Sequence, residues 1–188
     1  MSEKNGFTLI ELLITLVLFS ILASQTAPLV ESMIQNSRMT SRTNGILGVF
    51  QMARSEAIRR GNRVTACRST DLEECDTGAE GGWELGILVF EDMDNSGDRD
   101  PATEEIVQVY ESFNEHGDTL RGSANVNNYL SFSVQGTAQL ANGAVQTGDL
   151  ILCDSRGWSD HAKALTLSAT GRMESVTATD TSQSSCSP

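Results

Sequence analysis

The hydrophobic and polar positions divide the chain into a helical first part and a β-patterned remainder. Residues Phe7 to Ala23 form an almost unbroken apolar run. About 20 such residues, rising about 1.5 Å each in a helix, are enough to cross the hydrocarbon core of a bilayer. After Pro28 the apolar residues recur at three- and four-residue steps, which places one set on one helix face: Ile46, Val49, Phe50, Ala53, Ala57 and Ile58. The pattern therefore predicts one long helix, its first part in a membrane and its second part against a globular domain.

Single residues predict where this helix ends and where it is disturbed. Gly61 follows the basic pair Arg59-Arg60, as is typical of a helix end where cations meet the negative end of the helix dipole. We expect an interruption near Asn44-Gly45. Pro28 removes a backbone hydrogen bond, and it is expected either to kink the membrane helix or to end it.

After Gly61 the pattern changes to short β-like runs, separated by glycines and by clusters of asparagine and aspartate. The predicted strands are Arg63 to Arg68, Trp83 to Glu91, Glu105 to Glu111, Tyr129 to Gln135, Asp149 to Cys153 and Ala164 to Ser168. We find no repeat and no helix-period segment among them. One helix packed against antiparallel sheet, an α+β architecture, is the predicted fold.

Length, charge and motifs exclude several classes of function. The chain has 188 residues and a formal net charge of -12, which allows one membrane segment and one domain that repels nucleic acid and anionic lipid. It has no nucleophile elbow, no phosphate-binding glycine-rich loop and no metal triad. We therefore expect neither an enzyme nor a bound cofactor.

Four cysteines follow the apolar run. An even number in a domain that is expected to be exported suggests two disulfides and an oxidising compartment. A zinc site is less favoured, because no CxxC pair is present and His116 and His161 are not at ligand spacing. Three pairings are possible; we favour Cys67–Cys75, which closes a short acidic loop, and Cys153–Cys186, which pins a Ser/Thr-rich tail.

Glu11 is the unusual residue of the apolar run. A carboxylate in the hydrocarbon core costs about 2.5–3.5 kcal/mol on insertion scales, so an acid there indicates a function. A secretory signal peptide is not favoured, because the apolar run is too long and the preceding segment MSEKNG carries balanced charges. A plain membrane anchor explains the length of the run but not Glu11.

The segment Gly6-Phe-Thr-Leu-Ile-Glu11-Leu12 resembles the class III signal of type IV pilins and type II secretion pseudopilins. The resemblance implies that prepilin peptidase cuts between Gly6 and Phe7 and methylates the new amino terminus of Phe7. Glu11 would then be the fifth residue of the mature chain, where the family places its acid. We expect it to meet the new amine of a neighbouring subunit, a contact worth about 4 kcal/mol at 4 Å and an effective dielectric constant near 20. Pro28 lies where pilin helices bend or melt in the filament.

Three further stretches, ARSEAIRRGNRVTAC, WELGILVFEDMDNSGDRD and LSATGRM, are similar to the FimT/FimU and GspH group of minor pilins and pseudopilins. This resemblance implies a pilin-like fold, divided here into a leader (1–6), a transmembrane helix (7–28), its periplasmic continuation (29–61) and a β-rich head (62–188). The protein would be a low-copy minor pilin of the FimU type, helping to initiate assembly with other minor pilins and the major pilin. It would sit in the inner membrane and then in the pilus. The alternatives are a type II secretion pseudopilin and a DNA-binding minor pilin of the FimT type.

The stretch from Asp92 to Asp100 resembles the opening of an EF-hand calcium loop, because oxygen-bearing side chains alternate along it. The candidate ligands are Asp92, Asp94, Ser96, Asp98 and Asp100. The closing glutamate of such a loop is expected at position 103, which is threonine, and Glu104 falls one residue later. A polar turn between two strands is therefore favoured over a metal site.

Basic residues gather near the carboxyl end, and Arg156, Lys163 and Arg172 are the candidates for contacting DNA. FimT-type pilins that capture DNA carry a late GRxR motif, whereas this chain has Gly171-Arg172-Met173-Glu174. Phosphate binding depends on clustered cations. A missing arginine, an added acid and the negative head favour a protein that does not bind nucleic acid.

Overall fold

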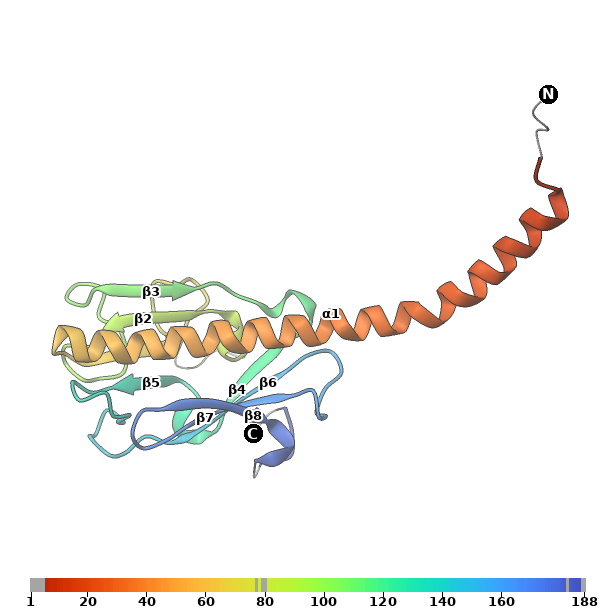
Figure 1. Cartoon of the computed structure of the whole chain (residues 1–188). Coiled ribbons are helices and arrows are strands. Elements are labelled where there is room, and N and C mark those ends of the chain that lie inside the picture. Colours follow the sequence, from red (N-terminus) through yellow and green to blue (C-terminus); the bar gives the residue numbers. More distant parts are fainter. Residues whose placement is uncertain (1–5, 77, 79–80, 182, 187–188) are drawn as a thin grey trace. The chain divides into compact units, whose positions relative to one another are not determined.

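The computed structural model describes residues 6–76, 78, 81–181 and 183–186, without the side chains of residues 25 and 27–29. A single helix, α1 (Leu9–Arg60), begins the fold and is followed by eight named strands (Figure 1). The chain divides into two compact units, with the boundary between Thr40 and Ser41, so α1 contributes to both. In the part of the chain that the structure describes, no helix is long and apolar enough to cross a membrane.

The expected interruption of the helix near Asn44-Gly45 is wrong, because α1 continues without a break to Arg60. Burial explains its continuity: the apolar face of this part of the helix packs into the core, with Ile46, Val49, Phe50, Ala53 and Ala57 each at most 3% exposed. Ile58 was predicted on the same face but is 53% exposed. At 3.6 residues per turn it lies about 100° round the helix from Ala57. The predicted helix end is confirmed: Gly61, at φ +70°, donates its N–H to the carbonyl of Ala57 at 3.1 Å.

Two antiparallel sheets of four strands complete the second unit (Figure 1). The first has the order β3-β2-β1-β5 and consists of β1 (Val64–Arg68), β2 (Ile87–Glu91), β3 (Ile106–Tyr110) and β5 (Tyr129–Phe132). The second has the order β4-β6-β7-β8 and consists of β4 (Thr119–Gly122), β6 (Gly148–Cys153), β7 (Lys163–Leu167) and β8 (Met173–Thr177). Short 3₁₀ turns lie between strands or after the last: η1 (Trp83–Leu85), η2 (Asn114–His116), η3 (Ala124–Val126) and η4 (Ala178–Asp180). The α+β prediction is confirmed.

Two strands were missed by the sequence pattern, and the predictions for β2 and β5 were too long by several residues. β4 has the sequence TLRG with a single large apolar residue, and β8 is an edge strand whose residues Glu174 and Ser175 are exposed. Neither carries the apolar alternation that signals a strand. Trp83 was predicted to begin a strand but begins η1, and its ring packs edge-on against Phe50 at 5.6 Å between centroids. Its Nε1–H donates to the carbonyl of Val126 at 3.0 Å, so the buried indole joins α1 to the turn η3.

Candidate functional site

The bond between Gly6 and Phe7, the expected cleavage site, lies before the start of helix α1. Gly6 and Phe7 have no regular secondary structure, and Phe7 is 82% exposed. Thr8 caps α1: its carbonyl accepts the N–H of Leu12 at 3.2 Å, and its Oγ1 accepts the N–H of Glu11 at 3.3 Å. The bond between Gly6 and Phe7 is therefore in an exposed, non-helical segment immediately before a capped helix.

Glu11 lies in the first turn of α1 and is exposed. The spacing Thr8-x-x-Glu11 is that of a capping box, a signal present in the sequence from which Thr8 could have been identified. A negative side chain in this turn is also favoured by the helix dipole. The carboxylate of Glu11 is thus held at the helix start with its side chain open to a partner. Pro28 lies in α1, but its side chain is outside the described residues.

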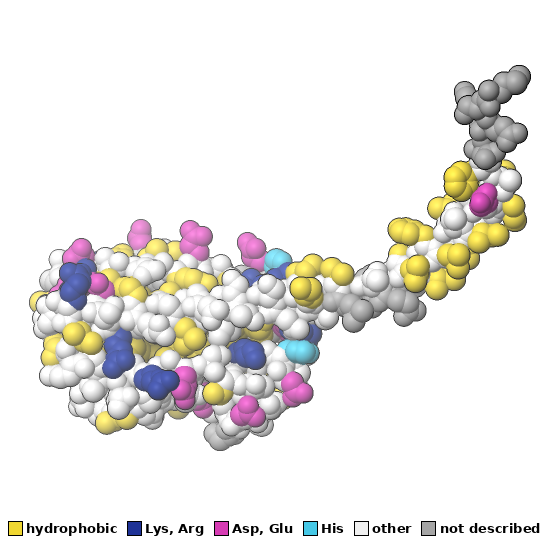
Figure 2. All heavy atoms as spheres, in the orientation of Figure 1, with side chains coloured by type: hydrophobic (Ala, Val, Ile, Leu, Met, Phe, Trp, Pro, Cys, Tyr) yellow, Lys and Arg dark blue, Asp and Glu magenta, His cyan; other side chains and the backbone are white. Residues whose placement is uncertain are grey.

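The side chains around Glu11 are apolar and exposed. Figure 2 shows hydrophobic side chains along the first part of α1. The large residues between Leu9 and Leu22 are 49–77% exposed, namely Leu9, Ile10, Leu12, Leu13, Ile14, Leu16, Val17, Leu18, Phe19, Ile21 and Leu22. A contiguous apolar surface of this kind marks a region that is covered by lipid or by other proteins.

A second cluster of polar side chains lies in the loop between β2 and β3. Asp92, Asp94 and Glu104 each place a carboxylate oxygen within 4.8 Å of the other two. Asp92 is 1% exposed and Glu104 is 4% exposed, whereas Asp94 is exposed. We call these three residues the acidic cluster. Of the five candidates from the sequence, the structure brings Asp92 and Asp94 together and adds Glu104, which the register of a calcium loop had excluded.

Backbone hydrogen bonds place Glu104 in the loop in spite of its late position. The carbonyl of Asp100 accepts the N–H groups of Thr103 at 3.2 Å and of Glu104 at 3.0 Å, so the chain turns back there. The Glu104 carboxylate accepts the N–H of Met93 at 2.8 Å and the N–H of Asp100 at 2.9 Å. The extra residue is accommodated by this turn, so the Glu104 carboxylate reaches the loop although it comes one residue after the closing position of a calcium loop.

The other three candidates, Ser96, Asp98 and Asp100, make hydrogen bonds within the loop itself. Ser96 donates its hydroxyl to the carbonyl of Asp98 at 2.8 Å, and Asp98 accepts the N–H of Arg99 at 3.1 Å. Asp100 accepts the N–H of Ala102 at 2.9 Å and the hydroxyl of Thr103 at 3.0 Å. None of these three side chains belongs to the acidic cluster that the described residues form.

Asp92 is the most buried member of the acidic cluster. Its Oδ2 accepts the hydroxyl of Thr65 at 2.6 Å and the N–H of Gly97 at 3.2 Å, and it lies 3.4 Å from Nε of Arg63. Its Oδ1 is buried and has no hydrogen-bond partner among the described residues. Burial raises the pKa of Asp92, whereas hydrogen bonds from Ser96 lower the pKa of Asp94. A buried polar atom without a partner costs about 1–3 kcal/mol, so Asp92 is held at a cost to stability.

Both disulfides are present with the pairing that the sequence favoured. Cys67 pairs with Cys75, and Cys153 pairs with Cys186. The first bridge closes the loop after β1, and Arg99 ties this loop to the acidic one by donating to the carbonyls of Glu73 at 2.6 Å and Glu104 at 2.9 Å. The second bridge holds the tail that follows η4 against β6.

The basic candidates do not form one patch. Arg156 donates to both carboxylate oxygens of Asp154, at 3.1 and 2.9 Å from Nε. Burial raises the pKa of Asp154, but the hydrogen bonds from Arg156 outweigh this and keep that pKa below its usual value. Lys163 and Arg172 lie at opposite ends of the β7–β8 hairpin, and Arg172 lies 3.7 Å from Glu174. Glu174, which stands in place of the second arginine of the GRxR motif, thus lies beside Arg172, the first arginine.

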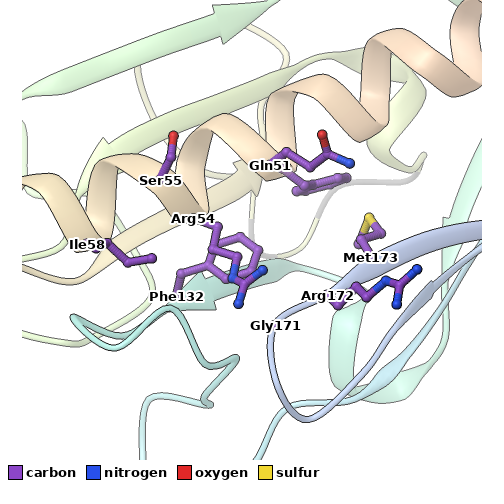
Figure 3. A pocket seen from close by; sticks show the side chains of 9 residues that line it. Gln51, Arg54, Ser55, Ile58, Phe132, Gly171, Arg172 and Met173 are labelled. Atoms are coloured by element: carbon purple, nitrogen blue, oxygen red, sulfur yellow. The ribbon is translucent and has the colours of Figure 1, made fainter.

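A groove of about 540 Å³ lies between α1 and the β7–β8 turn, with Arg54 and Arg172 on its walls (Figure 3). Arg54 donates to the carbonyls of Gly136 at 2.8 Å and Thr170 at 3.2 Å, so its charge is used to join two turns. Gly171 is required there, because a Cβ on it would come within 2.1 Å of the carbonyl oxygen of Gly136. Gly171, in the late LSATGRM stretch, therefore allows the backbone of this turn to lie close to the backbone at Gly136.

The family comparisons agree with this arrangement. The family model for type II transport protein GspH matches residues 42–171. The model for the prokaryotic N-terminal methylation motif matches residues 1–24, which include Gly6, Phe7 and Glu11. A search of curated protein sequences finds no match.

The fold is similar to that of two crystal structures of the type IV minor pilin FimU from Pseudomonas aeruginosa (strain PAO1). The structure in space group P21 is 17% identical, with a TM-score of 0.58, and the match covers 80% of this chain and 96% of that one. The structure in space group P65 is 18% identical, with a TM-score of 0.56, and the match covers 78% of this chain and 98% of that one. At these identities the likeness is one of fold.

Proposed function

The chain belongs to the GspH family of pilin-like proteins, and from this premise we propose that it is a minor pilin subunit of a type IV pilus that helps to initiate assembly. The observation that carries the proposal is the amino-terminal signal: the methylation motif covers residues 1–24, and its Gly6-Phe7 bond lies exposed before the capped helix. The family consists of structural pilins, and the proposed role is accordingly one of assembly.

Processing is the first step of the proposed function. Prepilin peptidase would cut between Gly6 and Phe7, leaving residues 1–6 as the leader, and would methylate the new amine of Phe7. The exposed apolar side chains of Leu9 to Leu22 support residues 7–28 as the membrane segment, since lipid would cover them. Residues 29–61 would continue the helix in the periplasm, and residues 62–188 would form the head.

Glu11 is the residue that we expect to direct docking into the filament. In lipid its carboxylate is costly, and the amine of a neighbouring subunit's Phe7 would offset that cost by about 4 kcal/mol at 4 Å and an effective dielectric constant near 20. The exposure of Glu11 supports a partner on another subunit. Other minor pilins and the major pilin are the proposed partners. Pro28 would shape the helix where subunits pack.

A type II secretion pseudopilin is the second candidate, because the matching family model is described as a type II transport protein. DNA binding of the FimT type has less support, because Arg156 and Arg172 already lie beside Asp154 and Glu174. A clean absence of a shifted DNA fragment at low salt would remove it.

The experiment that tests the proposal is the mass of the amino-terminal peptide from protein recovered from its native membrane and from sheared pili. We expect the peptide to begin at Phe7 with one added methyl group in both fractions. A peptide that begins at Met1 would contradict the processing and reduce the first segment to an anchor. Processed protein that is absent from pili and co-purifies with secretion components would favour the pseudopilin.

A further inference from the structure

We propose that the acidic cluster of Asp92, Asp94 and Glu104 is a binding site for a divalent cation, and that the cation is Ca²⁺. This site is independent of the amino-terminal signal and of the filament in which the subunit works. Three carboxylates from both ends of one loop converge to within 4.8 Å. Hard carboxylate and carbonyl oxygens are the ligands that Ca²⁺ prefers.

Charge is the first reason that the acidic cluster indicates a ligand. Among the ion pairs of the described residues, the cluster takes part in one, between Arg63 Nε and Asp92 Oδ2 at 3.4 Å. Arg99, the other nearby cation, donates instead to the backbone carbonyls of Glu73 and Glu104. Even with both Arg63 and Arg99 counted against the three carboxylates, the site keeps a net negative charge, which a divalent cation would offset.

The second reason is the buried carboxylate of Asp92. This residue is 1% exposed, and its Oδ1 has no hydrogen-bond donor among the described residues. Buried polar atoms in native proteins nearly always have a partner, and a bound ion or water is one explanation of an orphan of this kind. Because Asp92 belongs to the acidic cluster, a cation there would supply the missing partner.

The backbone of the loop is shaped as an ion-binding loop requires. Asn95 and Gly97 have positive φ angles of 62° and 79°, so the chain curls round the cluster. The N–H of Gly97 donates to Asp92 Oδ2 at 3.2 Å, and the N–H of Ser96 donates to Asp94 at 2.9 Å, which fixes both carboxylates. Gly97 thus stands where a calcium loop needs glycine for its sharp turn. Asp94 is exposed, so water can complete the coordination shell.

Ca²⁺ is favoured over the other common divalent ions by the donor set. The described cluster offers neither a thiolate nor an imidazole, the ligands that Zn²⁺ selects. Mg²⁺ demands near-ideal octahedral geometry and keeps most of its water, whereas Ca²⁺ accepts irregular sets of oxygens. For an exported module we expect a dissociation constant of about 10⁻⁴–10⁻³ M. The cation would join the two ends of the β2–β3 connection and so stabilise the edge strand β3.

The test is the thermal unfolding of the full chain in detergent, with Ca²⁺ alone as the ligand and EDTA as the blank. We expect 10 mM Ca²⁺ to raise the Tm by about 3–10 °C. The informative variant is Asp94→Asn, because asparagine keeps the oxygen that accepts the N–H of Ser96 but loses the charge. The matched control is Asp98→Asn, which removes the same charge from an exposed carboxylate of the same loop outside the cluster.

The proposal predicts that Asp98→Asn responds to Ca²⁺ as the wild type does and that Asp94→Asn loses most of the shift. Tb³⁺ provides a second readout: Tyr129, whose ring lies against Gly97, should sensitise its luminescence, and Ca²⁺ should displace it. No Tm shift and no Tb³⁺ signal in the folded wild type would overturn the proposal. So would an equal Ca²⁺ response in Asp94→Asn and the wild type.

Discussion

Gly45 of α1 lies against Tyr110 of β3 so closely that a Cβ on the glycine would be 2.8 Å from the tyrosine hydroxyl oxygen. The helix and the edge strand approach each other here because position 45 has no side chain. Gly48, further along the same helix, is exposed, and a Cβ built on it would have no atom within 4 Å. Gly45 therefore permits close packing of the helix on the strand, whereas Gly48 has no such role.

Replacing these glycines by alanine should affect stability differently. A glycine within a helix costs about 0.5–1 kcal/mol relative to alanine, so Gly48→Ala should raise the free energy of unfolding by that amount. Gly45→Ala should raise the free energy of unfolding by less, or lower it, because the half-buried ring of Tyr110 must move. Thermal unfolding followed by circular dichroism compares the two variants. A larger gain from Gly45→Ala than from Gly48→Ala would contradict the packing described here.

The two disulfides should contribute unequally to stability. Their cysteines are 8 residues apart for Cys67–Cys75 and 33 apart for Cys153–Cys186. The loop-entropy relation assigns these closures about 2.5 and about 3.7 kcal/mol. Replacing both cysteines of the longer loop by alanine should thus cost about 1 kcal/mol more than the same change in the shorter one. Equal losses in denaturant titrations would show that strain or packing, rather than loop length, decides the contribution.

Ionised carboxyl groups at and near the carboxyl end of α1 should make the stability of the protein depend on pH. Hydrogen bonds from Arg59, and then from Arg60, lower the pKa of Glu56 to about 2. The hydrogen bond from Asn62, and then that from Arg60, lower the pKa of Glu91. A carboxyl group whose pKa is lower in the folded state adds stability above its unfolded pKa and loses it as the pH falls through the folded one. The contribution of Glu56 should therefore be lost between its ordinary value of 4.5 and about 2.

A comparison of variants isolates this contribution from other titrations. The Tm difference between the wild type and Glu56→Gln should be present at pH 6 and should shrink toward zero near pH 2. Glu111→Gln, which neutralises an exposed glutamate, is the control, and its difference should vary less with pH. A Glu56→Gln difference that stays constant over this range would show that the ion pairs with Arg59 and Arg60 are not maintained in solution.

The fold was predictable where burial follows a regular period. The α+β class, the end of the helix at Arg60 and six of the strand regions follow from apolar spacing and from Gly61. The continuity of α1 through Gly45 was not predicted, because a glycine weakens a helix locally, whereas the burial of Ile46, Val49 and Phe50 in the folded core keeps this part helical. β4 and β8 were missed because their pairing with β6 and β7, rather than their own apolar content, makes them strands.

The candidate sites were predictable to different degrees. Gly6, Phe7 and Glu11 lie within one continuous motif, so the sequence alone is enough to nominate them as candidates, and their roles stay predictions. Glu104 was discounted by counting along a calcium loop, but the turn at Asp100 returns its side chain to Asp92. Counting residues cannot reveal such a turn. The acid beside Arg172 was visible in the sequence as Glu174, whereas the ion pair of Arg156 with Asp154 was identified in the folded head.

Glu11 gives the most direct test of the proposed assembly. The Glu11→Gln variant keeps the size of the side chain and the cleavage site but removes the charge that would meet the amine of Phe7 on a neighbouring subunit. It should be cut and inserted normally but should enter pili poorly. The control is Glu31→Gln, which neutralises an exposed glutamate elsewhere on α1 and should leave incorporation unchanged.

The measurement is the ratio of processed subunit in sheared pili to processed subunit in the membrane. If the contact is worth about 4 kcal/mol, as two unit charges 4 Å apart are at an effective dielectric constant near 20, its loss should lower this ratio by at least tenfold. A normal ratio for Glu11→Gln would show that the charge is not needed for docking. Equal defects in both variants would instead point to a general effect of α1 charge, and the specific pairing of Glu11 with Phe7 would have to be abandoned.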